Sequence, residues 1–175
     1  MISELDGKAP VVHPTAFISE ASYLVGDVVV GENSSFWPGS VARADYGSIR
    51  VGSNTNIQDN CVLHTDNLLE IGNNVVIGHG AVIHGAKIGD NVLIGVNAVL
   101  LDGSEVGDNC VIGAGAVVLQ NTKIPAESVV VGVPGKVRPM KPENHGNISY
   151  WASAYSLNAK KFKEQGLGIN YRDIE

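Results

Sequence analysis

Large aliphatic or aromatic residues recur at every sixth position along most of this chain. The period breaks between residues 42 and 51 and between residues 63 and 71, and it runs evenly from residue 88 to residue 130. The positions that carry it are Val12, Ile18, Leu24, Val30, Phe36, Ala42, Val51, Ile57, Leu63, Ile71, Ile77, Ile83, Ile88, Ile94, Leu100, Val106, Ile112, Val118, Ile124 and Val130. An amphipathic helix requires spacings of three and four, and a half-buried strand alternates every two residues, so neither explains the pattern. A fixed period over this length indicates a repeat architecture.

A second series of small or β-branched residues follows four positions after the first. It includes Ala16, Ser22, Val28, Ser34, Ser40, Thr55, Cys61, Val75, Ala81, Val92, Ala98, Ser104, Cys110 and Ala116. Gly, Asn and Asp fill much of the space between, as tight turns require. Each unit therefore predicts a short strand and a corner, with one large and one small residue directed inward. Stacked units form a parallel β-helix whose coils pair at about 4.7–4.9 Å.

The hexapeptide pattern resembles the left-handed β-helix family, in which three units make one triangular coil. That resemblance supplies the handedness, since general chirality rules favour right-handed crossovers. We expect residues 1–140 to form a left-handed parallel β-helix, and residues 141–175 to form a C-terminal helix and tail that pack on it. Ile148, Trp151, Tyr155, Ala159 and Phe162 recur at helical spacing and predict an amphipathic helix from about 146 to 165. The last ten residues are expected to be a loose tail.

Composition narrows the class of protein. The formal net charge of −6 argues against a nucleic-acid partner. No apolar run reaches the roughly 18 residues of a membrane span, and no targeting segment is recognisable, so we expect a soluble, cytoplasmic protein. The two cysteines, Cys61 and Cys110, hold small inward positions, which predicts buried core residues and no disulfide framework. Asp102 and Gly103 are expected to form a turn.

With three units per coil, the polar residues fall into two columns. Arg43, His64 and His84 each follow an inward residue on the third face of consecutive coils. Asp59 and His79 stack on the second face in the same way, and Gln58 sits beside Asp59. The two longer interruptions fall at one corner, where we expect outward loops.

His64 and His84 lie about one strand spacing apart in this frame, so both imidazoles can approach one ion at Zn–N distances of about 2.0–2.1 Å. His79 lies on another face and is expected to point elsewhere on its own chain. A three-histidine site is then closed most easily between subunits, with His79 from a neighbour. Three identical contacts of this kind close into a homotrimer.

At these residues the sequence resembles the gamma-class carbonic anhydrases. The matching segments are Arg43-Ala-Asp45, the run from Gln58 through Asp59 to His64, and His79-Gly-Ala-Val-Ile-His84. The likeness extends over nearly the whole chain. It implies a trimer with interfacial metal sites, in which His64 and His84 come from one chain and His79 from the next. Zinc is the expected metal, with ferrous iron or cobalt also suited to imidazole. The implied activity is reversible hydration of carbon dioxide to bicarbonate.

The resemblance also implies roles for other residues. Gln58 matches a residue that orients the nucleophile or the substrate, Arg43 and Asp59 match an interfacial salt-bridge pair, and Asp45 supports Arg43 or a neighbouring chain. For these residues, structural contacts in the trimer are the alternative. Tyr155 is a candidate to reach the metal pocket from the helix, with helix packing as the alternative.

The chain departs from the best-studied family pattern in two ways. Tyr46 stands where a glutamate follows the Arg-x-Asp motif. The long acidic loop after the first histidine, which bears a proton-shuttling glutamate, is absent, and Asp66 and Glu70 are the nearest carboxylates. These departures leave the metal ligands intact but predict low turnover. Two alternatives therefore stay open: a hexapeptide acyltransferase, and a catalytically silent metal-binding or scaffold protein.

Overall fold

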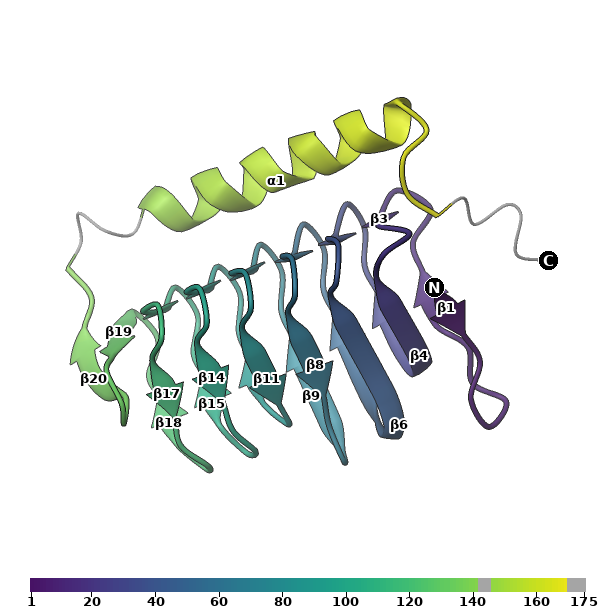
Figure 1. Cartoon of the computed structure of the whole chain (residues 1–175). Coiled ribbons are helices and arrows are strands. Elements are labelled where there is room, and N and C mark those ends of the chain that lie inside the picture. Colours follow the sequence, from purple (N-terminus) through teal and green to yellow (C-terminus); the bar gives the residue numbers. More distant parts are fainter. Residues whose placement is uncertain (142–145, 170–175) are drawn as a thin grey trace.

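The chain is a parallel β-solenoid with one α-helix lying along it (Figure 1). The computed structural model describes residues 1–141 and 146–169. The helix, α1, is Gly146–Glu164, and it returns along the stacked coils toward the first coil. Within the described residues, no helix combines the length and hydropathy that a membrane span needs. The division into units of residues 1–140 and 141–175 stays a prediction.

Two sheets of short strands build the solenoid. The first contains β1 (Ile2–Ser3), β2 (Val11–Val12), β4 (Tyr23–Val30), β6 (Val41–Val51), β8 (Val62–His64), β9 (Leu68–Ile71), β11 (Val82–His84), β12 (Lys87–Ile88), β14 (Val99–Leu100), β15 (Glu105–Val106), β17 (Val117–Val118) and β18 (Lys123–Ile124). The second contains β3 (Phe17–Ile18), β5 (Ser35–Phe36), β7 (Asn56–Ile57), β10 (Val76–Ile77), β13 (Leu93–Ile94), β16 (Val111–Ile112), β19 (Ser128–Val131) and β20 (Lys136–Pro139). Neighbouring strands are parallel except for β19 and β20, which close the last coil as an antiparallel pair.

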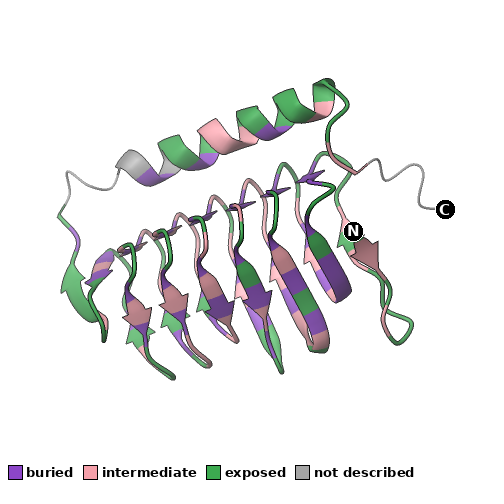
Figure 2. Ribbon diagram, in the orientation of Figure 1, coloured by how far each residue is buried: buried purple, intermediate pink, exposed green. Residues whose placement is uncertain are grey.

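The six-residue period is the period of the core. Every large position from Ile18 to Val130 is buried, and Val12, in the first unit, is partly buried. The small positions from Ala16 to Ala116 are buried as well. These two series make one continuous core along the solenoid, and Figure 2 shows the buried residues recurring from coil to coil. The predicted fold class and inward positions are confirmed.

Asparagine forms many of the corners. The asparagines at 33, 54, 60, 74, 91, 97, 109 and 121 all have φ between 53° and 60°. This left-handed conformation is strained for most side chains, but asparagine tolerates it because its short amide bonds to nearby backbone. The Asn-rich spacing therefore provides the bends between short strands.

The first interruption of the repeat is not the loop that the sequence predicted. β6 runs as one strand through the corner and pairs with β4 on one side and with both β8 and β9 on the other. The added residues find strand partners in the adjacent coil, which makes an extended backbone more favourable than a free loop. The second interruption, between residues 63 and 71, is mostly strand as well, and only residues 65–67 lie outside β8 and β9.

Helix α1 lies on the second sheet, and its bounds agree with the prediction of about 146 to 165. Ile148, Ala152 and Ala159 are buried. Figure 2 shows buried residues on the side of α1 that faces the coils. Trp37 is buried under the helix, with its ring centroid 5.2 Å from Phe17 and 5.1 Å from Phe162. The helix is therefore anchored by an aromatic cluster at the early coils.

The predicted loose tail is wrong for the residues directly after the helix. The amide of Gly168 donates to Glu20 Oε1 at 2.7 Å, and the amide of Ile169 donates to the carbonyl of Ile18 at 2.8 Å. Ile169 also packs against the core. Residues 170–175 of that predicted tail lie outside the described residues.

Candidate metal centre

His64 and His84 lie side by side on the first sheet. His64 ends β8 and His84 ends β11, and the two residues are direct partners in the parallel register. Arg43 of β6 is the partner of His64 on its other side, so the three residues form the predicted column. The imidazole centroids are 4.8 Å apart, and His64 Nδ1 lies 2.9 Å from His84 Nε2.

Each of these imidazoles is held by an aspartate through its other nitrogen. His64 Nε2 lies 2.8 Å from Asp45 Oδ1, and His84 Nδ1 lies 2.6 Å from Asp102 Oδ1. Asp45 also accepts a hydrogen bond from Arg43, which is one of the two contacts that the sequence allowed for it. Burial raises the pKa of Asp45, but the hydrogen bond from His64 and the charge of Arg43 outweigh it, so the pKa lies below its ordinary value.

The paired nitrogens make the site suited to a cation. If each carboxylate accepts a hydrogen bond from the N–H of its imidazole, the two nitrogens that face each other at 2.9 Å both carry lone pairs. Two bare lone pairs at this distance repel unless a proton or a metal ion lies between them. Neutral imidazoles oriented by carboxylates are characteristic zinc ligands. The residues therefore fit a divalent metal such as zinc.

A third potential ligand lies beside these histidines. Single donor atoms of His64, Asp66 and His84 all lie within 4.8 Å of one another. Asp66 is exposed, in the segment between β8 and β9. Sequence reasoning noted this carboxylate only as unmatched, because its closeness depends on the path of that segment.

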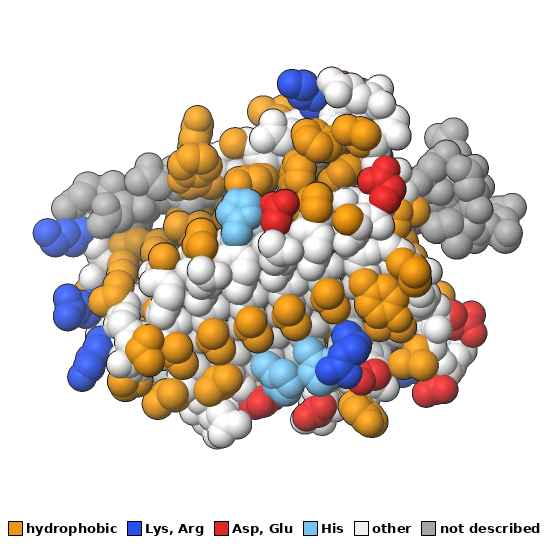
Figure 3. Space-filling view, in the orientation of Figure 1, with side chains coloured by type: hydrophobic (Ala, Val, Ile, Leu, Met, Phe, Trp, Pro, Cys, Tyr) orange, Lys and Arg blue, Asp and Glu red, His pale blue; other side chains and the backbone are white. Residues whose placement is uncertain are grey.

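His79 belongs to a separate site on the second face. It follows β10, and its Nδ1 lies 3.0 Å from Asp59 Oδ2, so the predicted stack of these two residues is present. Its backbone amide donates to Gln58 Oε1 at 3.1 Å, and Gln58 Nε2 donates to Asn56 Oδ1 at 3.2 Å. Figure 3 shows histidine side chains at two places on this face of the molecule, one beside an acidic group near the helix and one farther from it. His79 and His64 are not brought together within one chain.

Sequence reasoning missed Asn56 and Asp102. Asn56 is buried, and its Nδ2 has no hydrogen-bond partner within the described part of the chain. It stands two residues before Gln58 on β7, so the alternation of the strand was a signal that both side chains face outward together. Asp102 lies at a corner, where an aspartate is also expected for turn reasons alone.

Tyr155 lies on helix α1 next to this second group. Its ring packs edge-on against Trp37, with centroids 5.9 Å apart. Burial raises the pKa of Tyr155, and the negative charge of Asp59 raises it further. The tyrosine is therefore near Asp59, on the His79 side of the molecule, and it also contributes to helix packing.

Of the residues tied to the family departures, Asp66 lies beside the two histidines, whereas Tyr46 and Glu70 have other surroundings. Tyr46 is 80% exposed, and Glu70 lies 3.8 Å from Lys87.

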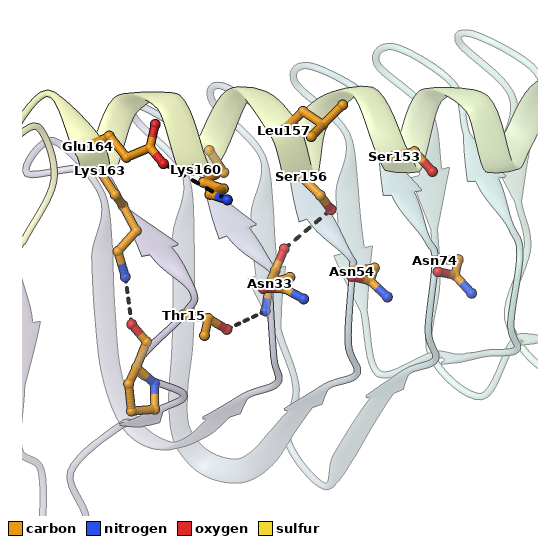
Figure 4. Close-up of a pocket in the computed structure, with 12 residues that line it drawn as sticks. Thr15, Asn33, Asn54, Asn74, Ser153, Ser156, Leu157, Lys160, Lys163 and Glu164 are labelled. Carbon is orange, nitrogen blue, oxygen red and sulfur yellow. Dashed lines mark hydrogen bonds and ion pairs between the residues drawn. The ribbon is translucent and has the colours of Figure 1, made fainter.

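A separate groove of about 870 Å³ lies between α1 and the corners of the coils, lined by Asn33, Asn54 and Asn74 (Figure 4). The residues that line it include none of the histidines, so it is not part of the candidate metal centre.

The repeat itself matches known family models. Residues 85–120 match the model described as bacterial transferase hexapeptide (six repeats), and residues 69–91 match the hexapeptide repeat of succinyl-transferase. Among solved structures, the chain is similar to a putative acetyltransferase from Bacillus cereus, with 34% identity and a TM-score of 0.90, over 94% of this chain and 98% of that one.

Curated relatives point to a narrower group. The chain is 43% identical to the mitochondrial gamma carbonic anhydrase 1 of Arabidopsis thaliana, over 85% of this chain and 58% of that protein. It is 46% identical to the carnitine operon protein CaiE of Escherichia coli O157:H7, over 55% of this chain and 50% of that protein. The chain thus spans about half to three fifths of the length of these relatives. These similarities and the hexapeptide solenoid show that the chain belongs to the gamma-class carbonic anhydrase family of hexapeptide-repeat, left-handed β-helix proteins.

Proposed function

We propose that this protein is a metal-dependent carbonic anhydrase that interconverts carbon dioxide and bicarbonate at sites shared between the subunits of a homotrimer. The observation that carries the proposal is the pair of facing imidazole nitrogens of His64 and His84, 2.9 Å apart, each backed by a carboxylate. The relationship to a gamma carbonic anhydrase supports the choice of reaction. We expect zinc, with ferrous iron or cobalt as the alternatives.

His79 is the proposed third ligand, donated by a neighbouring subunit. Asp59 holds its Nδ1, which leaves Nε2 as the nitrogen directed away from its own carboxylate. All three proposed ligands therefore have the same design, an imidazole with one nitrogen on an aspartate. In metal sites, such a carboxylate fixes the tautomer and raises the basicity of the ligand.

A row of apolar side chains supports the trimer. Tyr23, Val41, Val62, Val82, Val99 and Val117 are register partners from coil to coil along the face that carries His64 and His84. Tyr23 and Val62 are each 37% exposed, and Figure 3 shows hydrophobic side chains in a row across the coils beside histidines. An apolar strip of this length favours association with another protein surface. A second copy of this chain would bring its own second face, with His79, toward this strip.

The chain's own side chains provide for the substrate. When bound, zinc makes water acidic enough to supply a hydroxide nucleophile near neutral pH. Gln58 is held through both ends of its amide, and Asn56 Nδ2, which has no hydrogen-bond partner among the described residues, lies next to it. We propose that the two amides serve as donors to a carbon dioxide or bicarbonate oxygen. Arg43 supplies a positive charge for bicarbonate, and its proposed partner across the interface is Asp59. Tyr155 borders this group from the helix.

Complementation between two inactive variants tests the shared site. His64→Ala and His79→Ala should each abolish metal binding and hydration activity when expressed alone. In mixed trimers, a site that takes His64 and His84 from one variant and His79 from the other is complete, so part of the activity should return. No recovery in verified mixed trimers would contradict a site between subunits. His13→Ala is the matched control, because His13 is exposed and bonds to Thr15 at 2.9 Å, away from both groups.

Acyl transfer is the second candidate function. The solved structure at 34% identity is named a putative acetyltransferase, and the matching repeat models are those of transferases. This alternative predicts that acetyl-CoA binds and that chelators have no effect. A silent metal-binding or scaffold protein would keep the metal and the trimer but show no hydration. The cytoplasmic location and the absence of a nucleic-acid partner stay predictions, and cell fractionation would test the first.

A further inference from the structure

Asp102 makes the shortest contact to either histidine of the candidate centre. Its Oδ1 lies 2.6 Å from His84 Nδ1, compared with 2.8 Å between Asp45 and His64. Asp45 divides its carboxylate between His64 and Arg43, whereas His84 is the one ion-pair partner of Asp102 among the described residues. The charge of Asp102 is therefore directed at His84 alone.

The corner around Asp102 leaves room for this contact. Asp102 is stacked on Gly85, and a Cβ atom at position 85 would overlap the Asp102 carboxylate. Gly85 also has φ of +57°, a conformation that suits glycine. Gly85 thus leaves space for the Asp102 carboxylate, which extends from the next coil.

A purely structural corner residue behaves differently. The Asn73, Asp90 and Asp108 side chains each accept a hydrogen bond from a backbone amide of the adjacent coil, at 2.7–2.8 Å. The only hydrogen bond of the Asp102 side chain among the described residues is to His84. A turn alone does not explain an aspartate whose carboxylate bonds to an imidazole instead of the backbone.

We infer that Asp102 is a positioning residue that keeps the proton of His84 on Nδ1, so that Nε2 faces His64 with its lone pair free. The inference extends the proposed metal site and rests on it for its function. A carboxylate in this position fixes both the tautomer and the ring orientation, and the loss of such a partner typically lowers metal affinity by about 10–100-fold. Asp102→Ala should show a loss in this range, and Asp102→Asn a smaller one, because an amide oxygen still accepts the Nδ1 proton but carries no charge.

Two measurements on the full-length chain test this role. ¹⁵N NMR of the metal-free protein reads the tautomer of His84, with His84→Gln used to assign its signals. We expect the proton on Nδ1 in the wild type and in Asp102→Asn, and its transfer toward Nε2 in Asp102→Ala. Zinc competition with a chromophoric chelator measures affinity in the same variants. Asp108→Ala is the matched control, since it removes a corner carboxylate that bonds to the Asp90 amide and touches no histidine.

The outcomes separate this inference from the proposed function. An unchanged tautomer and unchanged zinc affinity in a folded Asp102→Ala chain would overturn the positioning role. A wild-type trimer that binds no zinc would overturn the proposed function, and the NMR result would then still decide whether Asp102 sets the tautomer. Equal losses in Asp102→Ala and Asp108→Ala would assign Asp102 to the corner alone and would also overturn the inference.

Discussion

The ion-pair cluster at Asp27 yields a prediction whose size follows from the structure. Asp27 lies in β4, at the corner where the register between β4 and β6 shifts. Its carboxylate is 2.7 Å from Arg50, 3.6 Å from Lys8 and 2.7 Å from the Ser48 hydroxyl, and its side chain is 23% exposed. The hydrogen bond from Arg50, followed by that from Ser48, lowers the pKa of Asp27 from 3.8 to about 2.

This pKa sets the free energy that Asp27→Asn should remove. Each tenfold change in proton affinity corresponds to about 1.4 kcal/mol, so a fall from 3.8 to about 2 corresponds to about 2 kcal/mol of folding stability. Because the pKa is lower in the folded chain, this stability is fully present above the unfolded value near 3.8. It is lost as the pH falls through about 2, where the folded carboxylate takes up its proton.

Urea denaturation at several pH values measures the effect. Asp27→Asn should lower the free energy of unfolding by about 2 kcal/mol at pH 7, and the difference from the wild type should shrink toward pH 3 and below. Glu70→Gln is the matched control, because Glu70 forms an exposed pair with Lys87 at 3.8 Å, and such pairs contribute about 0–1 kcal/mol. A loss that is equal at pH 7 and pH 3 would refute the electrostatic explanation.

Three further predictions concern the core, the interface and the cysteines. Ile83 is fully buried between Leu63 and Leu100, so Ile83→Ala should lower the free energy of unfolding, measured by urea denaturation, by about 2–5 kcal/mol. A loss smaller than that of a surface substitution would contradict its core position. Arg43→Ala should raise the dissociation constant of the trimer about tenfold or more, as measured by analytical ultracentrifugation. An unchanged dissociation constant together with an unchanged hydration rate would show that Arg43 is not part of the site. Burial raises the pKa of Cys61 to about 11. At pH 8 its thiol should therefore react with a chromogenic disulfide reagent far more slowly in the folded chain than in the unfolded chain. Equal reaction rates in the two states would contradict the burial of Cys61.

The repeat made most of the fold predictable. One large and one small residue in each unit fix which side chains face inward, and the register of stacked coils then follows from simple counting. That counting placed His64 beside His84 and Arg43 beside His64, as the parallel pairing shows. It failed at the first interruption, because β6 gains strand partners on both sides that the period alone does not reveal.

The details of the site were less predictable, because they depend on side-chain directions at corners. The contact between His84 and Asp102 joins residues of different coils across a turn, where the hexapeptide pattern gives no direction. The second contact of Asp45, to His64, was missed for the same reason. Contacts between subunits lie beyond what the register of one chain determines, so the pairing of Arg43 with Asp59 and the use of His79 by a neighbour remain proposals.

Metal content per chain tests the central claim most directly. The protein should be purified without chelator or added metal, with oxygen excluded, and analysed by elemental mass spectrometry beside His84→Ala and His13→Ala. The account predicts one zinc or iron per chain in the wild type and in His13→Ala, and none in His84→Ala. A folded trimer that contains no metal and takes up none on dialysis against zinc would contradict the proposed site.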